Sequence, residues 1–445
     1  MTASTSLRRR FGPAALMGGG LLVVGIAGYG FIALTGRTLS TADVAAVSSL
    51  YLMINIIGPG VFVALEQETS RSVSSTLAKG GHAAPVARRA AVLGGLMLAG
   101  VLVVLAAISP VLVNRALGHQ WSLFAAVLLG TATSALVYLA RGVLGGTRRF
   151  AGYSATLAFE GAARILPCVV LAASGTADAA AYALLFASGS AIGALAGTPW
   201  LRGLDRANPT GPAGIDDELA GVDPTAPGGT LGRMASATLV LAGSTLLSQL
   251  VANLAPIVVG SRLAHDTATA AAFTSAFILV RIPFFLFAPV QAMLLPSLTA
   301  AATTGKLSVF RRTLRLILTA IAAVGIPGAI ASLLIGPLAV QVLFGAHVRL
   351  SGPVLGLLGI GTIALMVAQV LQPALVALGG HRAVTTSWLL GSVVLTGLLF
   401  LPGDPVHAAV IAQLAGSAVV VAGMARAVAT DLRGRSAPVS ESVPS

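Results

Sequence analysis

Long apolar runs separated by short polar segments make up most of this chain. Twelve of the runs are long enough to cross a bilayer, which takes about 20 mostly apolar residues. Their approximate starts are Gly12, Asp43, Ala90, Trp121, Gly152, Ala179, Met234, Thr269, Thr313, Gly352, Thr385 and Val406. Each run is closed by Arg, Lys, Asp, Pro-Gly or a polar cluster. The pattern predicts an all-α integral membrane protein with twelve transmembrane helices.

Composition agrees with this pattern and excludes an ordinary soluble domain. Only 9% of the 445 residues are charged, 56% are hydrophobic, and the mean hydropathy is +0.92. A soluble helix would alternate its apolar stripe with a charged face. Cys168 is the only cysteine, the six histidines show no metal-ligand spacing, and no Walker motif is present. We therefore expect no disulfide, no metal, no cofactor and no nucleotide hydrolysis.

Basic residues indicate the orientation, because Lys and Arg resist translocation and collect in cytoplasmic loops. With the N-terminus inside, 21 basic residues fall in cytoplasmic segments and 4 in external loops. The external ones are Arg37, Arg115, Arg262 and Arg349. We predict a multi-pass protein of the cytoplasmic (inner) membrane with both termini cytoplasmic. The net charge of +13 is spread over helix ends without interleaved aromatics, which is typical of contacts with anionic lipids and not with nucleic acid.

The polar stretch from Leu201 to Arg233 divides the chain into two halves. Six helices precede it and six follow, and the second set trails the first by roughly 220 to 230 residues, as an internal duplication would leave it. We predict an N-terminal six-helix bundle (1–200), a cytoplasmic linker (201–233), a C-terminal six-helix bundle (234–430) and a disordered cytoplasmic tail (431–445). Because six is even, both bundles enter the membrane in the same direction, which predicts a pseudo-two-fold axis along the membrane normal.

Ionisable residues inside the spans are few, and each costs several kcal/mol unless it is paired or faces water. Glu160 and Arg164 lie four residues apart and share a helix face, so they can form an ion pair or present Arg164 to an anion. Arg281 lies mid-helix, where it either faces a cavity or pairs across the bundles with Glu160 or Glu66. Glu66 lies near the cytoplasmic end of the second helix, where it can pair with Arg71.

Uncharged polar side chains within the spans can hydrogen-bond between helices or line a polar cavity. The candidates for the cavity are Asn55, Asn253, Gln291 and Gln369.

Three local patterns give the chain a family resemblance. They are Gly36-Arg37-Thr38-Leu39-Ser40 followed by Asp43, Glu160 followed by Arg164-Ile165-Leu166, and Arg281-Ile282-Pro283 leading to Leu295-Pro296-Ser297. With twelve helices in two halves, the chain resembles the polysaccharide flippases of the multidrug/oligosaccharidyl-lipid/polysaccharide (MOP) exporter superfamily. It departs from the drug-exporting branch, which relies on acids in helix 1 or helix 7, because neither helix carries one here.

The resemblance implies an alternating-access transporter, not an enzyme, that flips a polyprenyl-pyrophosphate-linked oligosaccharide for cell-envelope polysaccharide synthesis. It implies a cationic central cavity, which Arg164 and Arg281 fit. Arg37 and Arg71 are further candidates for substrate binding, and Glu160 and Glu66 for coupling or ion pairing. We expect a monomer, with glycan-assembly enzymes as candidate partners.

Two other functions stay open at this point. A cation-coupled exporter of small amphiphiles would share the helix count. An integral-membrane glycan polymerase or ligase would need an external catalytic group, for which Arg37 with Asp43, or Arg349, is the available material.

Overall fold

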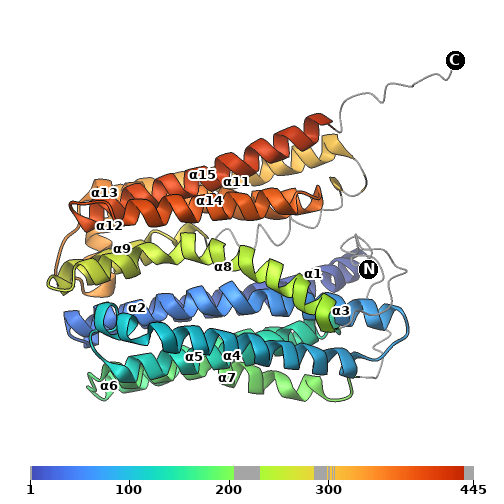
Figure 1. Cartoon of the computed structure of the whole chain (residues 1–445), viewed down its shortest axis with the longest axis horizontal. Coiled ribbons are helices and arrows are strands. Elements are labelled where there is room, and N and C mark those ends of the chain that lie inside the picture. The colour runs from blue at the N-terminus through green and yellow to red at the C-terminus, as the bar shows by residue number, and fades with distance from the viewer. Residues whose placement is uncertain are drawn as a thin grey trace.

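The computed structural model describes residues 3–204, 231–284, 298, 301–302, 304 and 306–434. Every regular element in these ranges is helical (Figure 1). The elements are α1 (Ala3–Thr38), α2 (Thr41–Ile57), the π-helical turn η1 (Gly58–Phe62), α3 (Val63–Ala78), α4 (Ala83–Arg115), α5 (Trp121–Gly146), α6 (Phe150–Ala173), α7 (Ala179–Leu201), α8 (Leu231–Arg262), α9 (Thr267–Leu279), α11 (Leu307–Leu334), α12 (Gly336–Phe344), α13 (Gly352–Ala377), α14 (His381–Leu399) and α15 (Pro405–Gly434).

Within the described ranges, twelve helices are long and apolar enough to cross a membrane, so the predicted fold class is confirmed. Most predicted starts agree with the structure to within about one helical turn. The third and ninth spans begin earlier than predicted, at Ala83 and Leu307, because the basic residues that precede the apolar runs lie within the first two turns of α4 and α11. The backbone hydrogen bonds of a helix form outside the hydrocarbon region as well as inside it. The helices therefore continue beyond the apolar runs into their cationic ends.

The second span is interrupted where Gly58-Pro59-Gly60 predicts it. The π-helical turn η1 joins α2 to α3, with Pro59 in its first turn. The short helix α12 is an element that the hydropathy pattern missed, since its apolar residues prolong the ninth run. Gly336 and Pro337 start it as a separate helix of 9 residues, too short to cross the membrane.

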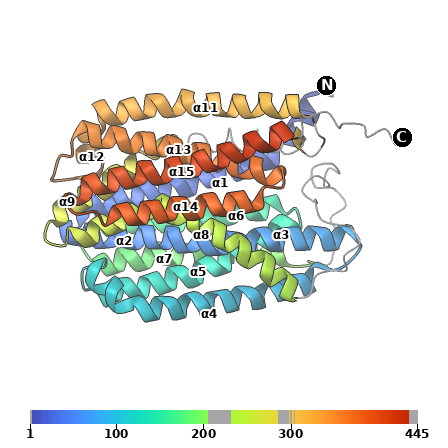
Figure 2. The ribbon, with the colours of Figure 1, turned by 45° about the horizontal axis from the view of Figure 1, so that its top comes forward.

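The spans form two six-helix halves, one on each side of the undescribed residues 205–230. In Figure 1 the first half lies below, with α11, α13, α14 and α15 above and α8 and α9 between them. Figure 2 shows α4 and α11 at opposite edges of the molecule. Most of the predicted linker, with its acidic residues Asp216-Asp217-Glu218, and the tail beyond Gly434 lie outside the described residues.

The halves contact each other along α2, α3 and α8. The Thr245 hydroxyl donates to the carbonyl of Gly60 at 2.6 Å. A Cβ at Gly60 would lie 3.2 Å from the backbone of Leu246, so glycine permits this close approach of the two helices. Phe62 of η1 belongs to the same buried apolar cluster as Met234 of α8. The seam between the halves is therefore packed along this side.

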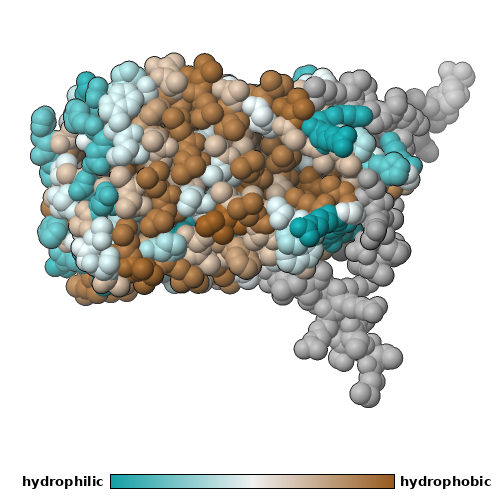
Figure 3. Space-filling view, turned by 90° about the horizontal axis from the view of Figure 1, so that it is seen from below, coloured by the Kyte–Doolittle hydropathy of each residue, from teal (hydrophilic) through white to brown (hydrophobic). Residues whose placement is uncertain are grey.

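A band of apolar side chains crosses the middle of the molecule on the face that Figure 3 shows. Figure 3 shows it between polar ends, as a bilayer requires. Its members include well-exposed residues of α4 and α6, such as Leu96, Val103 and Val170. The protein is therefore a multi-pass membrane protein.

Candidate functional site

The predicted ion pair between Glu160 and Arg164 is present inside the N-terminal half. Arg164 Nη2 lies 2.7 Å from Glu160 Oε1, as the spacing of four residues on α6 favours. Ser190 of α7 completes the contact, because its hydroxyl donates to Glu160 Oε1 at 2.7 Å and accepts from Arg164 Nη2 at 2.9 Å. Glu160 is only 4% exposed. The carboxylate is thus fixed between two helices.

A second guanidinium, that of Arg141 on α5, shares the same carboxylate. Arg141 Nη2 donates to Glu160 Oε2, and its Nε donates to the Thr156 hydroxyl at 2.9 Å. Arg141 is 5% exposed, although its place near the end of α5 suggested a topology determinant in the cytoplasm. Two buried arginines therefore share one carboxylate, and Glu160 neutralises neither of them completely.

Arg164 also borders a group of aromatic rings. Its guanidinium carbon lies 4.6 Å from the centroid of the Phe186 ring. Phe186 contacts Phe31 at 4.4 Å and Tyr51 at 5.4 Å between centroids. The Nε of Arg164 is buried without a hydrogen-bond partner among the described residues. Arg164 thus keeps one donor free on a wall formed by α1, α2 and α7.

Arg281 follows the end of α9 in the other half and is held by neutral groups. It donates to Asn253 Oδ1 at 2.7 Å and to the carbonyl of Ala252, both on α8. Its guanidinium carbon lies 4.2 Å from the centroid of the Phe277 ring. No carboxylate of the described residues pairs with Arg281, so the ion pair across the bundles that the sequence left open does not form here.

Tyr51 of α2 interacts electrostatically with both Arg164 and Arg281. Both guanidiniums lie close enough to its hydroxyl to interact with it electrostatically, and Arg281 interacts in the same way with Tyr29 of α1. The N-terminal half thus contributes Arg164 and the C-terminal half contributes Arg281 to one region at the seam. We take this region as the candidate functional site. Sequence reasoning did not single out either tyrosine.

The acidic residues of α3 have different partners. Arg71 donates two hydrogen bonds to Glu68, from Nε to Oε2 at 2.9 Å and from Nη2 to Oε1 at 2.7 Å. Glu66 instead accepts a hydrogen bond from the Tyr153 hydroxyl at 2.6 Å and forms no ion pair with any described residue. The structure therefore places Arg71 in a local pair at the end of the bundle that holds the termini.

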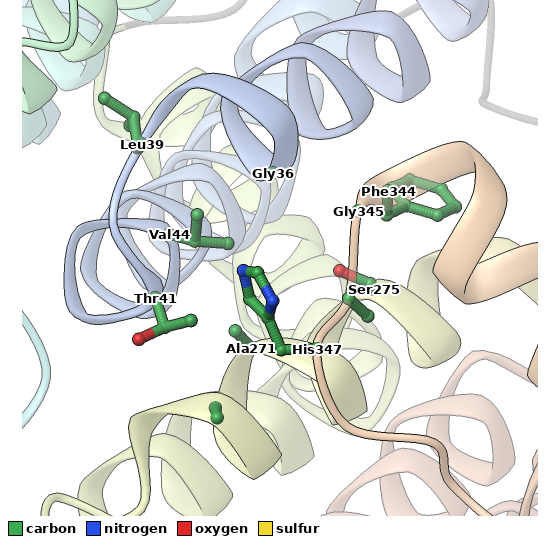
Figure 4. Close-up of a pocket in the computed structure, with 11 residues that line it drawn as sticks. Gly36, Leu39, Thr41, Val44, Ala271, Ser275, Phe344, Gly345 and His347 are labelled. Carbon is green, nitrogen blue, oxygen red and sulfur yellow. The ribbon is translucent and has the colours of Figure 1, made fainter.

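Arg37 lies at the opposite end of the molecule from Arg71. It donates to the carbonyl of Val342 on α12, while the hydroxyls of Thr41 and Thr267 lie 3.4 Å apart. Beside these contacts a small recess lies between the halves (Figure 4), and the side chain of His347 lies among its lining residues. The two halves thus meet at this end.

The remaining polar candidates fall in different places. Asn253 binds Arg281 and donates to Gln249 Oε1 at 3.0 Å. Asn55 donates to the backbone carbonyl of Tyr51 at 2.8 Å, so its amide forms a hydrogen bond within α2. Gln369 is half-buried in α13, and Gln291 lies outside the described residues. Within the described ranges no three His, Cys, Asp or Glu side chains gather as a metal site.

No family model matches this sequence, and no curated protein matches it. Solved structures do match its fold. An inward-facing multidrug resistance MATE family transporter of the MOP superfamily superimposes with a TM-score of 0.71 at 14% identity, over 93% of this chain and 96% of that chain. A mutant of the MATE transporter VcmN from Vibrio cholerae gives a TM-score of 0.65 at 16% identity, over 98% and 99% of the two chains.

A third structure is a MOP superfamily transporter from Pyrococcus furiosus. It is described as having a binding pocket of reverse polarity that suggests a different function. It superimposes with a TM-score of 0.57 at 11% identity, over 94% of this chain and 98% of that chain. All three likenesses cover nearly the full length of both chains. The chain therefore has the fold of the MATE transporters, with its spans in two six-helix halves.

Proposed function

We propose that this protein is an alternating-access transporter that moves a lipid-linked oligosaccharide, through its anionic pyrophosphate group, across the cytoplasmic membrane. The observation that carries the proposal is Arg281, a guanidinium within a span that no described carboxylate neutralises. A cation in this position is costly unless it faces water or an anionic ligand. Arg164 faces the same tyrosine from the other half, so an anion at the seam would meet both arginines.

The chemistry of the two arginines suits a pyrophosphate. A guanidinium presents donors in a planar fork that matches phosphate oxygens, and hydrogen bonds between ionised groups are the stronger kind. Arg281 is positioned by an amide oxygen, a carbonyl and an aromatic face, none of which cancels its charge. Arg164 shares its counterion with Arg141. Both cations therefore retain positive charge for a ligand.

The packing of the halves supports loading from the cytoplasm. At the end opposite the termini, Arg37 reaches α12 and Thr41 meets Thr267, so the halves are in contact there. The structure also superimposes well on an inward-facing MATE transporter. With the termini cytoplasmic, as the bias of basic residues predicts, the seam is closed toward the outside.

A cation-coupled exporter of small amphiphiles fits the fold equally well, and the charge of the site distinguishes the two functions. The sequences of α1 and α8 contain no Asp or Glu, and the site presents two arginines. A cationic substrate would be repelled there. The MOP transporter from Pyrococcus furiosus, with its reverse-polarity pocket, is consistent with different pocket charges on this fold.

The test is transport by Arg281 variants in vesicles that contain a fluorescent lipid-linked oligosaccharide, with an impermeant quencher reporting the outer leaflet. Arg281→Ala should lower the rate roughly 10- to 100-fold, because a hydrogen bond to a charged group contributes about 1.5–3 kcal/mol. Arg281→Lys should recover part of the rate, since an ammonium lacks the fork. The matched control is Arg312→Ala, an exposed arginine of α11.

Two outcomes would overturn the proposal. Normal transport by a folded Arg281→Ala protein would remove the arginine from the substrate path. Faster transport of a cationic amphiphile by the same variant, with no effect on the glycan lipid, would favour the exporter.

A further inference from the structure

The three glutamates within the described spans differ in what neutralises them. Glu160 is bound by two guanidiniums and the Ser190 hydroxyl. Glu68 accepts two hydrogen bonds from the guanidinium of Arg71. Among the described residues, the one hydrogen-bond partner of the Glu66 side chain is the phenol of Tyr153, at 2.6 Å. Glu66 is therefore the one of these three glutamates that forms no ion pair with a described residue.

Glu66 is fixed within the N-terminal half although it forms no ion pair. A Cβ at Gly142 of α5 would lie 2.8 Å from the Glu66 carbonyl oxygen, so α3 and α5 are in close backbone contact. The ionisable groups that interact with Glu66 are Arg141 and Tyr138 of α5 and Tyr153 and Glu160 of α6. The described part of α8 that packs on α3 has no acidic residue.

We infer that Glu66 is a proton-binding site, and that proton binding there is linked to anion binding at Arg164. A proton on Glu160 would break two ion pairs and leave two arginines unbalanced. A proton on Glu66 breaks none, and the Tyr153 oxygen is in place to accept a hydrogen bond from the protonated acid. Proton exchange at Glu66 thus breaks no ion pair of the buried network.

The link to Arg164 runs through shared partners. Glu66 and Glu160 both interact with Arg141, and Glu160 divides its oxygens between Arg141 and Arg164. With both acids ionised, the two arginines and two glutamates sum to zero charge. With Glu66 protonated the sum is +1, and Arg141 turns more fully to Glu160. Arg164 is then less neutralised and binds an anion more strongly.

Linkage makes this effect reciprocal, since an anion at Arg164 must then favour the proton on Glu66 to the same degree. This part of the inference rests on the proposed function, because it assumes an anion at the seam. The proton site itself does not rest on it. The two parts can be tested separately.

The proton site is tested without any ligand, by infrared difference spectra of the purified full chain over a pH titration. The wild type should show a protonated-carboxyl C=O band that rises as the pH falls. Glu66→Gln should remove this band, and Tyr153→Phe should shift it. The matched control is Glu68→Gln, a glutamate on the same helix that has an ion pair, which should leave the band unchanged. A band that survives Glu66→Gln and disappears in Glu160→Gln would overturn the inference.

The linkage is tested with geranylgeranyl pyrophosphate as probe, by calorimetric titration in buffers of different ionisation enthalpy. The wild type should take up protons in excess of those that Glu66→Gln takes up, and its affinity should rise at least about fivefold more than that of the variant as the pH is lowered. Equal proton uptake by both proteins, with normal binding, would overturn the linkage and leave the proposed function intact. Absence of binding by the wild type would count against the proposed function, and the infrared result would still decide on the proton site.

Discussion

Replacement of Glu160 should destabilise the protein far more than replacement of its neighbour Arg164. In the structure Glu160 serves two guanidiniums, so Glu160→Gln leaves both Arg141 and Arg164 without a counterion in a buried setting. Arg164→Gln leaves Glu160 paired with Arg141 and bonded to Ser190. A simple pair would lose the same interaction in either variant, whereas a shared carboxylate makes the two losses unequal.

The burial of the three side chains sets the size of the two losses. Removal of one partner from a buried ion pair costs about 3–5 kcal/mol, because the other charge stays buried. Loss of Arg164 removes one contact to a charged group, about 1.5–3 kcal/mol, and less than the full value because its side chain is 12% exposed. A loss of 1 kcal/mol lowers the Tm of a domain the size of one six-helix half by about 2–4 °C. Glu160→Gln should therefore lower the Tm by about 10 °C. Arg164→Gln should lower it by roughly half as much.

Cys168 provides the assay, since it is the only cysteine and is fully buried in α6. A thiol-reactive fluorogenic dye reports its exposure on heating. The double variant Glu160→Gln with Arg164→Gln should be more stable than Glu160→Gln alone, because one stranded guanidinium remains instead of two. The matched control is Arg312→Gln, which removes an exposed arginine of α11 and should cost less than about 1 kcal/mol.

Two results would refute this reasoning. Equal loss of Tm in Glu160→Gln and Arg164→Gln would show that Arg141 takes no part. Near-normal glycan transport by the stable Arg164→Gln protein would remove Arg164 from the substrate path.

Two further predictions concern the closed end and the orientation. A disulfide crosslink between Thr41→Cys and Thr267→Cys should arrest transport reversibly, because the two threonine hydroxyls lie 3.4 Å apart across the halves. Full-rate transport by the crosslinked protein would exclude a gate there. In a Cys168→Ser background, an impermeant thiol reagent applied to intact cells should label Ala177→Cys and not Lys79→Cys, because the bias of basic residues places the two loops on opposite sides. The reverse labelling pattern would invert the topology.

Hydropathy predicted the number of spans and most of their starts, because the bilayer imposes a length and a composition on each helix. It could not predict α12, whose apolar residues prolong the ninth run without a polar break. The start at Gly336-Pro337 is visible in the sequence, but Gly and Pro also occur inside membrane helices, as Pro327 does in α11. Hydropathy measures burial in lipid and does not indicate where a helix changes direction.

The site was predictable only where its contacts are local. Glu160 and Arg164 share a helix, so their spacing was enough to predict the pair. Arg141 reaches Glu160 from another helix, 19 residues away, and its place near a helix end is also typical of a topology determinant. Arg281 finds Asn253 at a separation of 28 residues. Such contacts depend on helix packing, which the spacing of residues along one sequence does not reveal.

The partition of the site between the halves bears directly on how a substrate could drive the cycle. Every described partner of Arg164 belongs to the N-terminal half, namely Glu160, Ser190 and Phe186. The described hydrogen-bond and ring partners of Arg281 all belong to the C-terminal half, on α8 and α9, and its electrostatic interaction with Tyr29 and Tyr51 crosses the seam. The halves can therefore move apart without breaking any of these bonds. An anion that binds both arginines would be held most strongly when the halves place them together, and only such a difference in affinity between states lets a ligand shift their populations.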